Sequence, residues 1–219
     1  MKLLLTSEGF TNQKIIQALR DLAVRPFSEL NFIFIPTAAN VEPGDKSWLI
    51  KDLHICSGLG FKMVDILDLA AVDHKMAKNR LEQADIMMFG GGNTFYLMDV
   101  LRDKKLDKII PQLLKTRIYA GISAGSMIAG PSLSLSQSQR LYYEWMEKST
   151  ANEQALNLVP FEIRPHLNSP DFPNVNLQYL NTVANQVENP FYAIDDQTAI
   201  VVIGKKTTVV SEGVWQKFN

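Results

Sequence analysis

The sequence predicts an α/β fold with three layers, in which helices cover both faces of a mostly parallel sheet. Up to about residue 130, short apolar runs alternate with amphipathic segments of helical length, an order typical of parallel sheets. Runs such as FIFI and IMMF are apolar without alternation, as expected for strands buried on both faces. The length of 219 residues, 46% of them hydrophobic, suits one domain with a well-buried core.

The elements of the first part of the chain follow from these apolar runs and their spacing. In the first helix, Ile15, Ile16, Leu19 and Leu22 recur at helical spacing. In chain order we expect a strand at 2–7, a helix at 12–22, a strand at 31–39, a helix at 48–56 ended by glycines, a strand at 62–69, a polar helix at 73–83, a strand at 84–92 that runs into a glycine loop, one or two helices at 94–115, and a strand at 117–123.

The pattern changes after about residue 130. The serine-rich segment 131–145 alternates, which is compatible with a hairpin or an excursion loop. Further strands are expected at 161–167 and 192–203, and the runs at 206–211 and 213–218 indicate an antiparallel hairpin at the C-terminal end. Because no repeat or linker divides the chain, we interpret residues 1–219 as one domain.

Composition excludes several classes of protein. Twenty-two basic residues oppose twenty-three acidic ones, a balance without general attraction to nucleic acid or anionic membranes. A single cysteine, Cys56, rules out an internal disulfide, and no Cys/His cluster has zinc spacing. We therefore expect no metal and no cofactor. The apolar start MKLLL is too short for a signal peptide, and no run approaches a membrane span, so a cytoplasmic location is expected.

A candidate nucleophile lies in the segment YAGISAGSMIAG, where Ser123 stands between Gly121 and Gly125. A serine nucleophile at a strand-to-helix turn needs small neighbours, because its backbone is strained. The next N–H, from Ala124, would point toward an oxyanion at the start of the helix. A chance match in a turn of small residues is the alternative, but the strand-turn-helix context favours a nucleophile. The loop Gly90–Gly92 follows the preceding strand and is expected at the same crevice.

The choice of a base is narrow, because the chain has only three histidines. His54 and His74 fall in predicted helices, whereas His166 follows a strand in a loop rich in Pro and Asn, where site residues are common. An orienting carboxylate would come from Asp195 or Asp196, and only one of them can face the site, since adjacent strand residues point to opposite faces. The order Ser, His, acid differs from the Ser, acid, His order of α/β-hydrolases and argues against an esterase or lipase.

Four segments resemble, in order and at similar spacing, the motifs of the dipeptidase E and cyanophycinase family of serine peptidases. They are MMFGGGNTFYLM, YAGISAGSMI, IRPHLNS and AIDDQTAI. This resemblance covers nearly the whole chain and implies a flavodoxin-like sandwich, related to class I glutamine amidotransferases but with serine in place of their cysteine.

The resemblance also implies roles for individual residues. Ser123 would be the nucleophile, His166 the base and Asp196 the third member. Gly92 and the N–H of Ala124 would form the oxyanion hole, and Gly91 and Asn93 would bind substrate.

Two departures from the family pattern bear on the activity. The family usually has glutamate where this chain has Asp196, so the shorter side chain is expected to reach His166 less well, or through water. Dipeptidase E also carries arginines after its histidine motif that help to hold an N-terminal aspartate of the substrate. Here residues 172–186 contain no Arg or Lys, which leaves Arg140 and Arg164 as substitutes.

The predicted function is therefore hydrolysis of small peptides by a serine peptidase, with a specificity other than strict N-terminal aspartate. The alternative is a non-catalytic protein that kept the fold and binds a small ligand or anion on its glycine loop. Nucleotide binding is disfavoured, because the loop lacks the G-x-x-x-x-G-K-[ST] spacing. The expected partner is a small peptide, and the sequence leaves the oligomeric state open, with a homodimer as one option.

Overall fold

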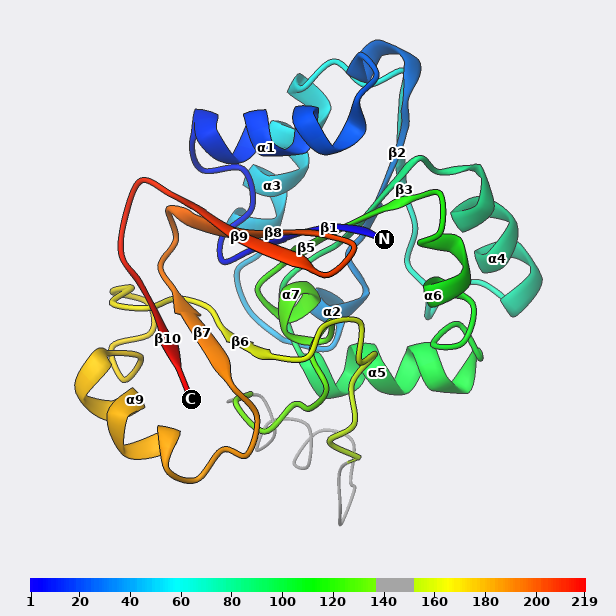
Figure 1. The fold of residues 1–219 in the computed structure, drawn as a ribbon. Helices are drawn as coiled ribbons and strands as arrows, with labels where there is room; N and C mark the ends of the chain where they lie inside the picture. The colour runs from blue at the N-terminus through cyan, green and yellow to red at the C-terminus, as the bar shows by residue number, and fades with distance from the viewer. Residues whose placement is uncertain (137–151) are drawn as a thin grey trace.

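Seven strands form the central sheet of the computed structural model, which describes residues 1–136 and 152–219 (Figure 1). The strand order is β3-β2-β4-β5-β1-β8-β9; the first five run parallel, and β8 and β9 are antiparallel to their neighbours. The strands are β1 (Lys2–Thr6), β2 (Asn31–Ile35), β3 (Met63–Ile66), β4 (Ile86–Phe89), β5 (Ile118–Ile122), β8 (Thr198–Ile203) and β9 (Lys206–Ser211).

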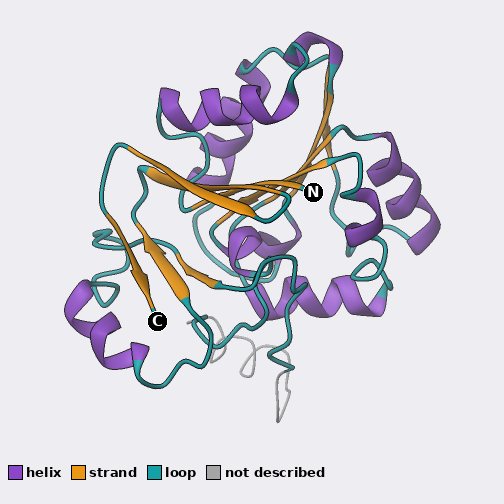
Figure 2. Cartoon of the chain, in the orientation of Figure 1, coloured by secondary structure: helices purple, strands orange, loops and turns teal. Residues whose placement is uncertain are grey.

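Helices cover both faces of this sheet, which completes the three layers (Figures 1 and 2). On one face lie α1 (Gln13–Ala23) and α3 (Ser47–Gly58); on the other lie α4 (His74–Gln83), α5 (Thr94–Asp103) and α6 (Ile110–Leu113). Asn12 and Asp73 cap α1 and α4, since their side chains accept hydrogen bonds from the first-turn N–H groups. Among the described residues, no helix is long and apolar enough to cross a membrane.

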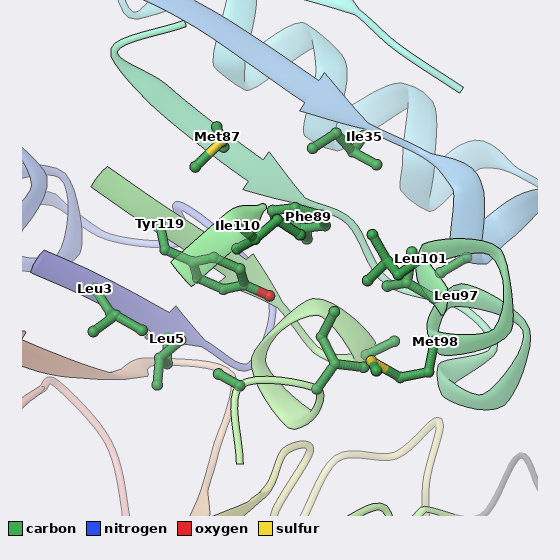
Figure 3. Packing of buried hydrophobic residues seen from close by; sticks show 14 of the residues in the cluster. Leu3, Leu5, Ile35, Met87, Phe89, Leu97, Met98, Leu101, Ile110 and Tyr119 are labelled. Carbon is green, nitrogen blue, oxygen red and sulfur yellow. The ribbon is translucent and has the colours of Figure 1, made fainter. Parts of the chain in front are cut away.

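Alternate strand residues supply two separate cores. Leu3 and Leu5 of β1 pack into the cluster that also contains Phe89 and Tyr119 (Figure 3), whereas Leu4 between them packs against α1. All of these residues are nearly inaccessible to solvent. The predicted α/β fold class with a mostly parallel central sheet is confirmed, and the runs FIFI and IMMF are buried as expected, whereas the edge strands β3 and β9 are partly exposed.

A second, smaller sheet has the order β10-β7-β6, with β6 and β7 parallel and β10 antiparallel to β7. It packs with α9 around a third cluster that includes Phe191 and Leu180. Between the two sheets in Figure 1 lies the short α7. These elements are β6 (Glu162–Arg164), β7 (Phe191–Ile194), β10 (Trp215–Phe218), α7 (Ala124–Met127) and α9 (Leu177–Ala184).

Three expectations about elements were wrong. The runs at 206–211 and 213–218 do not pair with each other: β9 pairs with β8, while β10 joins the second sheet. The expected strand at 192–203 is two strands, because Asp195 accepts hydrogen bonds from Gln197 N and Val214 N in a turn between them. The strand expected at 31–39 ends at Ile35, since α2 (Thr37–Asn40) begins there.

The expected excursion at 131–145 is described only up to residue 136. Ser132 forms an isolated antiparallel bridge with Gln154. Arg140, one of the two arginines considered as substitutes, lies outside the described residues.

Candidate active site

A cavity of about 650 Å³ opens where several strands end. Its lining includes residues that directly follow strands of the parallel sheet: Ser7 after β1 and Ser123 after β5. His166 after β6 and Asp196 after β7 complete this edge of the lining. The cavity therefore lies at the carboxyl ends of the strands, where parallel α/β folds bind ligands.

The turn that carries Ser123 is strained and tightly packed. Ser123 has φ 46° and ψ −106°, in a region that residues other than glycine rarely adopt. A Cβ on Gly125 would lie 2.0 Å from the carbonyl oxygen of Phe89, and one on Gly121 would lie 2.6 Å from backbone atoms of Gly125 and its successor. Both glycines of the motif are therefore required by close approach of backbone to backbone.

A buried tyrosine supports this turn from the sheet side. Tyr119 stacks on Phe89 with 4.8 Å between ring centroids, and its hydroxyl donates a hydrogen bond to the carbonyl of Gly125 (Figure 3). The strained turn is thus held by the core beneath it, which keeps the Ser123 side chain at the cavity.

Ser123, His166 and Asp196 form one continuous chain of hydrogen bonds. His166 Nε2 lies 2.9 Å from Ser123 Oγ, and His166 Nδ1 lies 2.8 Å from Asp196 Oδ1. In this arrangement Nδ1–H donates to the carboxylate, and Nε2 accepts from the serine hydroxyl. The expectation that aspartate would reach His166 poorly, or through water, was wrong, because the contact is direct.

Ser7 is a member of this network that the sequence did not predict. Its hydroxyl donates to Asp196 Oδ1 at 2.6 Å, and its oxygen accepts the backbone N–H of His166 at 2.8 Å. Ser7 is fully buried. The available signal was its position directly after the first strand of the parallel sheet.

The charge on Asp196 is stabilised locally. Burial alone would raise the pKa of its carboxyl, but hydrogen bonds from His166, Ser7 and Ser169, together with electrostatic attraction to His166, outweigh burial and hold the pKa below its ordinary value. Asp195 serves a different purpose: its carboxylate accepts hydrogen bonds from Val214 N and the hydroxyl of Thr198, away from His166. Of the two acids that the sequence left open, Asp196 is the one that contacts the histidine.

His166 itself is held in an uncommon conformation. Its φ is 64°, and its ring stacks on Phe172 with 4.3 Å between centroids. The other histidines lie elsewhere: His54 is exposed on α3, and His74 contacts the carbonyl of Lys104 at the start of α4. Phe172 was not foreseen, since an aromatic residue in a proline-rich loop carries no specific signal.

The glycine loop brings backbone N–H groups to the cavity. Gly92 has φ 126°, and a Cβ there would lie 2.3 Å from the carbonyl oxygen of Ala38. Within the described residues, neither the N–H of Gly92 nor that of Ala124 has a hydrogen-bond acceptor. Gly91 also lines the cavity, and a Cβ built on Gly91 would lie 3.6 Å from the Cβ of Ser123.

Asn93 does not line the cavity, contrary to the expectation. Its side chain is fully buried, and its amide oxygen accepts the N–H of Tyr96 and so caps α5. Asparagine at the start of a helix commonly takes this role, which competes with ligand binding.

Acidic side chains line another part of the cavity. Asp52 of α3 is 7% exposed; burial first, and then the negative charge of Glu8, raise its pKa to about 7. Glu42 also lines the cavity, and burial raises its pKa. In the described part of the chain, no three His, Cys, Asp or Glu side chains are arranged to hold a metal ion.

The fold and this site define a serine-type hydrolase of the α/β class. The model of peptidase family S51 matches residues 3–210, and the chain belongs to this family. This confirms the resemblance found in the sequence motifs and the assignment as a serine-type peptidase.

Individual relatives agree with the family. The uncharacterized peptidase Lmo0363 of Listeria monocytogenes is 29% identical over 79% of this chain and 82% of its own length. Peptidase E of a Nostoc species is 33% identical over 65% of this chain and 54% of its own length. The crystal structure of a candidate peptidase E from Listeria monocytogenes superimposes with a TM-score of 0.79 at 25% identity, covering 97% of this chain and 98% of that one.

Proposed function

We propose that this chain hydrolyses short peptides, with Ser123 as the nucleophile, His166 as the general base and Asp196 as the residue that orients His166. The observation that carries the proposal is the continuous hydrogen-bonded chain from Ser123 Oγ through His166 to Asp196 Oδ1. A serine hydroxyl is a weak nucleophile at neutral pH and needs such a base to take up its proton.

The reaction follows from these contacts. His166 Nε2 takes the proton as Ser123 Oγ attacks the peptide carbonyl carbon, and the N–H groups of Gly92 and Ala124 donate to the resulting oxyanion. His166 then gives the proton to the leaving amine, the C–N bond breaks, and an ester on Ser123 remains. A water molecule, deprotonated by His166, attacks this ester; the bond from the carbonyl carbon to Ser123 Oγ breaks, His166 returns the proton to Oγ, and the new carboxylate product leaves.

The cavity supports short substrates. Its volume of about 650 Å³ lies in the range of sites for small molecules. Helix α9, which follows the histidine loop, contains no Lys or Arg. This supports a specificity other than strict N-terminal aspartate, because the expected arginines are missing from that element.

The proposal is tested by a peptide-library assay of the parent chain and Ser123→Ala. The expected result is turnover by the parent chain and none by the variant, with unchanged circular dichroism. Ser126→Ala is the matched control: it removes a hydroxyl from the same turn, but that hydroxyl donates to the carbonyl of Thr6 and does not line the cavity. Full activity of a folded Ser123→Ala would refute the proposal.

A fluorophosphonate probe separates catalysis from the non-catalytic alternative. The direct contact between Asp196 and His166 removes one of the two observations that favoured a protein without activity. We expect stoichiometric labelling at Ser123 in the parent chain and no labelling in Ser123→Ala. A folded parent chain that is neither labelled nor active on any peptide would support ligand binding without catalysis.

A further inference from the structure

Arg164 is a buried cation with spare hydrogen-bonding capacity in the wall of the cavity. It ends β6, two residues before His166, and is 5% exposed. Its Nη1 donates to the carbonyl of Leu135 at 3.3 Å. Its Nη2 is buried and has no hydrogen-bond partner in the described part of the chain.

This arrangement is unfavourable for the protein alone. A buried polar group without a partner loses its hydrogen bonds to water, and for a charged group the loss is larger. Burial lowers the pKa of Arg164 to about 10, which leaves it cationic at neutral pH. Unpaired buried polar groups are rare enough to need an explanation, and a ligand that completes the hydrogen bonds is one.

Glu162, the acidic residue of β6, forms no ion pair with Arg164. Glu162 accepts hydrogen bonds from Ser134 at 2.8 Å and from Asn189 at 3.0 Å instead. No ion pair of Arg164 is formed among the described residues. Arg164 therefore has no counter-ion among the described residues, and it lines the cavity that a substrate carboxylate would enter.

Arg164 is also distinctive among the residues that line the cavity. No other described lining residue is a lysine or arginine, whereas Glu8, Glu42 and Asp52 are acidic. A peptide carboxylate that enters the cavity would thus find its cationic partner at Arg164. The planar fork of a guanidinium matches a carboxylate in geometry, and such charge-assisted hydrogen bonds are among the stronger ones in proteins.

We propose that Arg164 is a specificity-determining residue that binds a carboxylate of the peptide substrate through its unpartnered Nη2. The proposal rests on the proposed peptidase function for its kinetic test, but the binding itself does not require turnover. The carboxylate is either the free C-terminus of a short peptide or an acidic side chain, and both share the same recognition chemistry.

The kinetic experiment compares peptides that differ in one carboxylate. One pair has a C-terminal acid or amide; the other has Glu or Gln at the same position. For the parent chain we expect a higher kcat/KM for the charged member of one pair, and that pair identifies the source of the carboxylate. Arg164→Gln should lower kcat/KM for this charged peptide by about 10- to 100-fold more than kcat/KM for its neutral partner.

Two further variants complete the kinetic design. Arg164→Lys keeps the charge but not the fork, so the ratio of charged to neutral turnover should fall only partly. Arg25→Gln is the control: it removes an exposed guanidinium that pairs with Glu29 and Asp85, away from the cavity lining. If both Arg164 variants keep the parent's charged-to-neutral ratio, or if the parent shows no preference in either pair, the proposal is overturned.

A binding experiment separates failure of this proposal from failure of the proposed function. Titration calorimetry on Ser123→Ala measures the affinity for the same peptides without turnover. Adding Arg164→Gln to this background should weaken binding of the charged peptide by a similar 10- to 100-fold factor, and circular dichroism checks folding. If Arg164→Gln does not fold, Arg164→Lys in the same background decides. If the affinity for the charged peptide does not depend on Arg164, the proposal for Arg164 is overturned, even if the parent chain is an active peptidase. If the affinity depends on Arg164 but the parent chain hydrolyses no peptide, the proposal for Arg164 stands and only the peptidase function is rejected.

Discussion

The substitution Asp196→Asn tests the contact between His166 and its carboxylate. In the proposed mechanism His166 becomes an imidazolium, and the adjacent negative charge stabilises it. Asp196 Oδ1 lies 2.8 Å from His166 Nδ1, and the side chains are only 21% and 12% exposed, so water screens the pair weakly. Asparagine has nearly the same shape, so the substitution removes the charge and little else.

The magnitude follows from this geometry. With an effective dielectric constant of about 20, two unit charges about 4 Å apart attract by about 4 kcal/mol, which corresponds to roughly a 10³-fold change in rate. Ser7 donates its hydroxyl proton to the same Oδ1, so the amide oxygen of asparagine, not its nitrogen, is expected at that position. His166 then keeps its tautomer, and the loss should stay below the ~10⁴-fold that accompanies an inverted tautomer. We expect kcat/KM to fall by about 10²- to 10³-fold.

The assay is the initial rate of peptide hydrolysis at saturating and at low substrate, with folding checked by circular dichroism. Asp171→Asn serves as the control, because Asp171 lines the same cavity and is exposed, but its side chain makes no hydrogen bond to His166. The control should change kcat/KM little. A folded Asp196→Asn with the kcat/KM of the parent chain would refute the role assigned to the carboxylate.

Three further substitutions test other parts of the site. Gly125→Ala places a Cβ 2.0 Å from the carbonyl oxygen of Phe89 and should lower the free energy of unfolding by about 3 kcal/mol or more; an unchanged urea midpoint would contradict this. The pKa of Asp52 is raised to about 7 from 3.8, so the parent chain should lose stability as the pH rises between these values. At pH 8, Asp52→Asn should therefore have a higher free energy of unfolding in urea than the parent, by up to about 4 kcal/mol. At pH 4 the two should be equally stable, and an equal gain at both pH values would exclude titration as the cause. Ser7→Ala removes a hydrogen bond to the carboxylate of Asp196 and the acceptor of the His166 N–H, so kcat/KM should fall by about 10-fold; an unchanged kcat/KM would reduce Ser7 to a packing role.

The order of most strands and helices could be predicted, because the inner parallel strands of the central sheet are apolar runs bounded by polar turns. The pairing of the last strands could not be predicted in this way. The runs at 206–211 and 213–218 are neighbours in sequence, and local pattern favours a hairpin. Their partners depend instead on the sheet to which each run adds, and β10 pairs with β7, from which β8 and β9 separate it in the chain.

The site could be predicted in part for a similar reason. Ser123 and His166 stand out because the flanking glycines and the scarcity of histidines restrict the choice. Asn93 was misjudged, because its residue type suits both ligand binding and helix capping, and only the start of α5 decides between them. Ser7 carries only the weak signal of following the first strand, since its importance comes from contacts with residues that lie 159 and 189 positions away in sequence.

Ser7 also links the residues that the two sheets contribute to the site. Ser123 and Ser7 belong to the central sheet, whereas His166 follows β6 of the smaller sheet, and Asp196 lies where the chain passes from β7 to β8. A small rotation of one sheet against the other would therefore separate His166 from Ser123. Ser7 opposes this rotation, because it binds the backbone N–H of His166 and the carboxylate of Asp196 at the same time. The alignment of Ser123, His166 and Asp196 thus depends on the junction between the sheets as much as on the strained turn at Ser123.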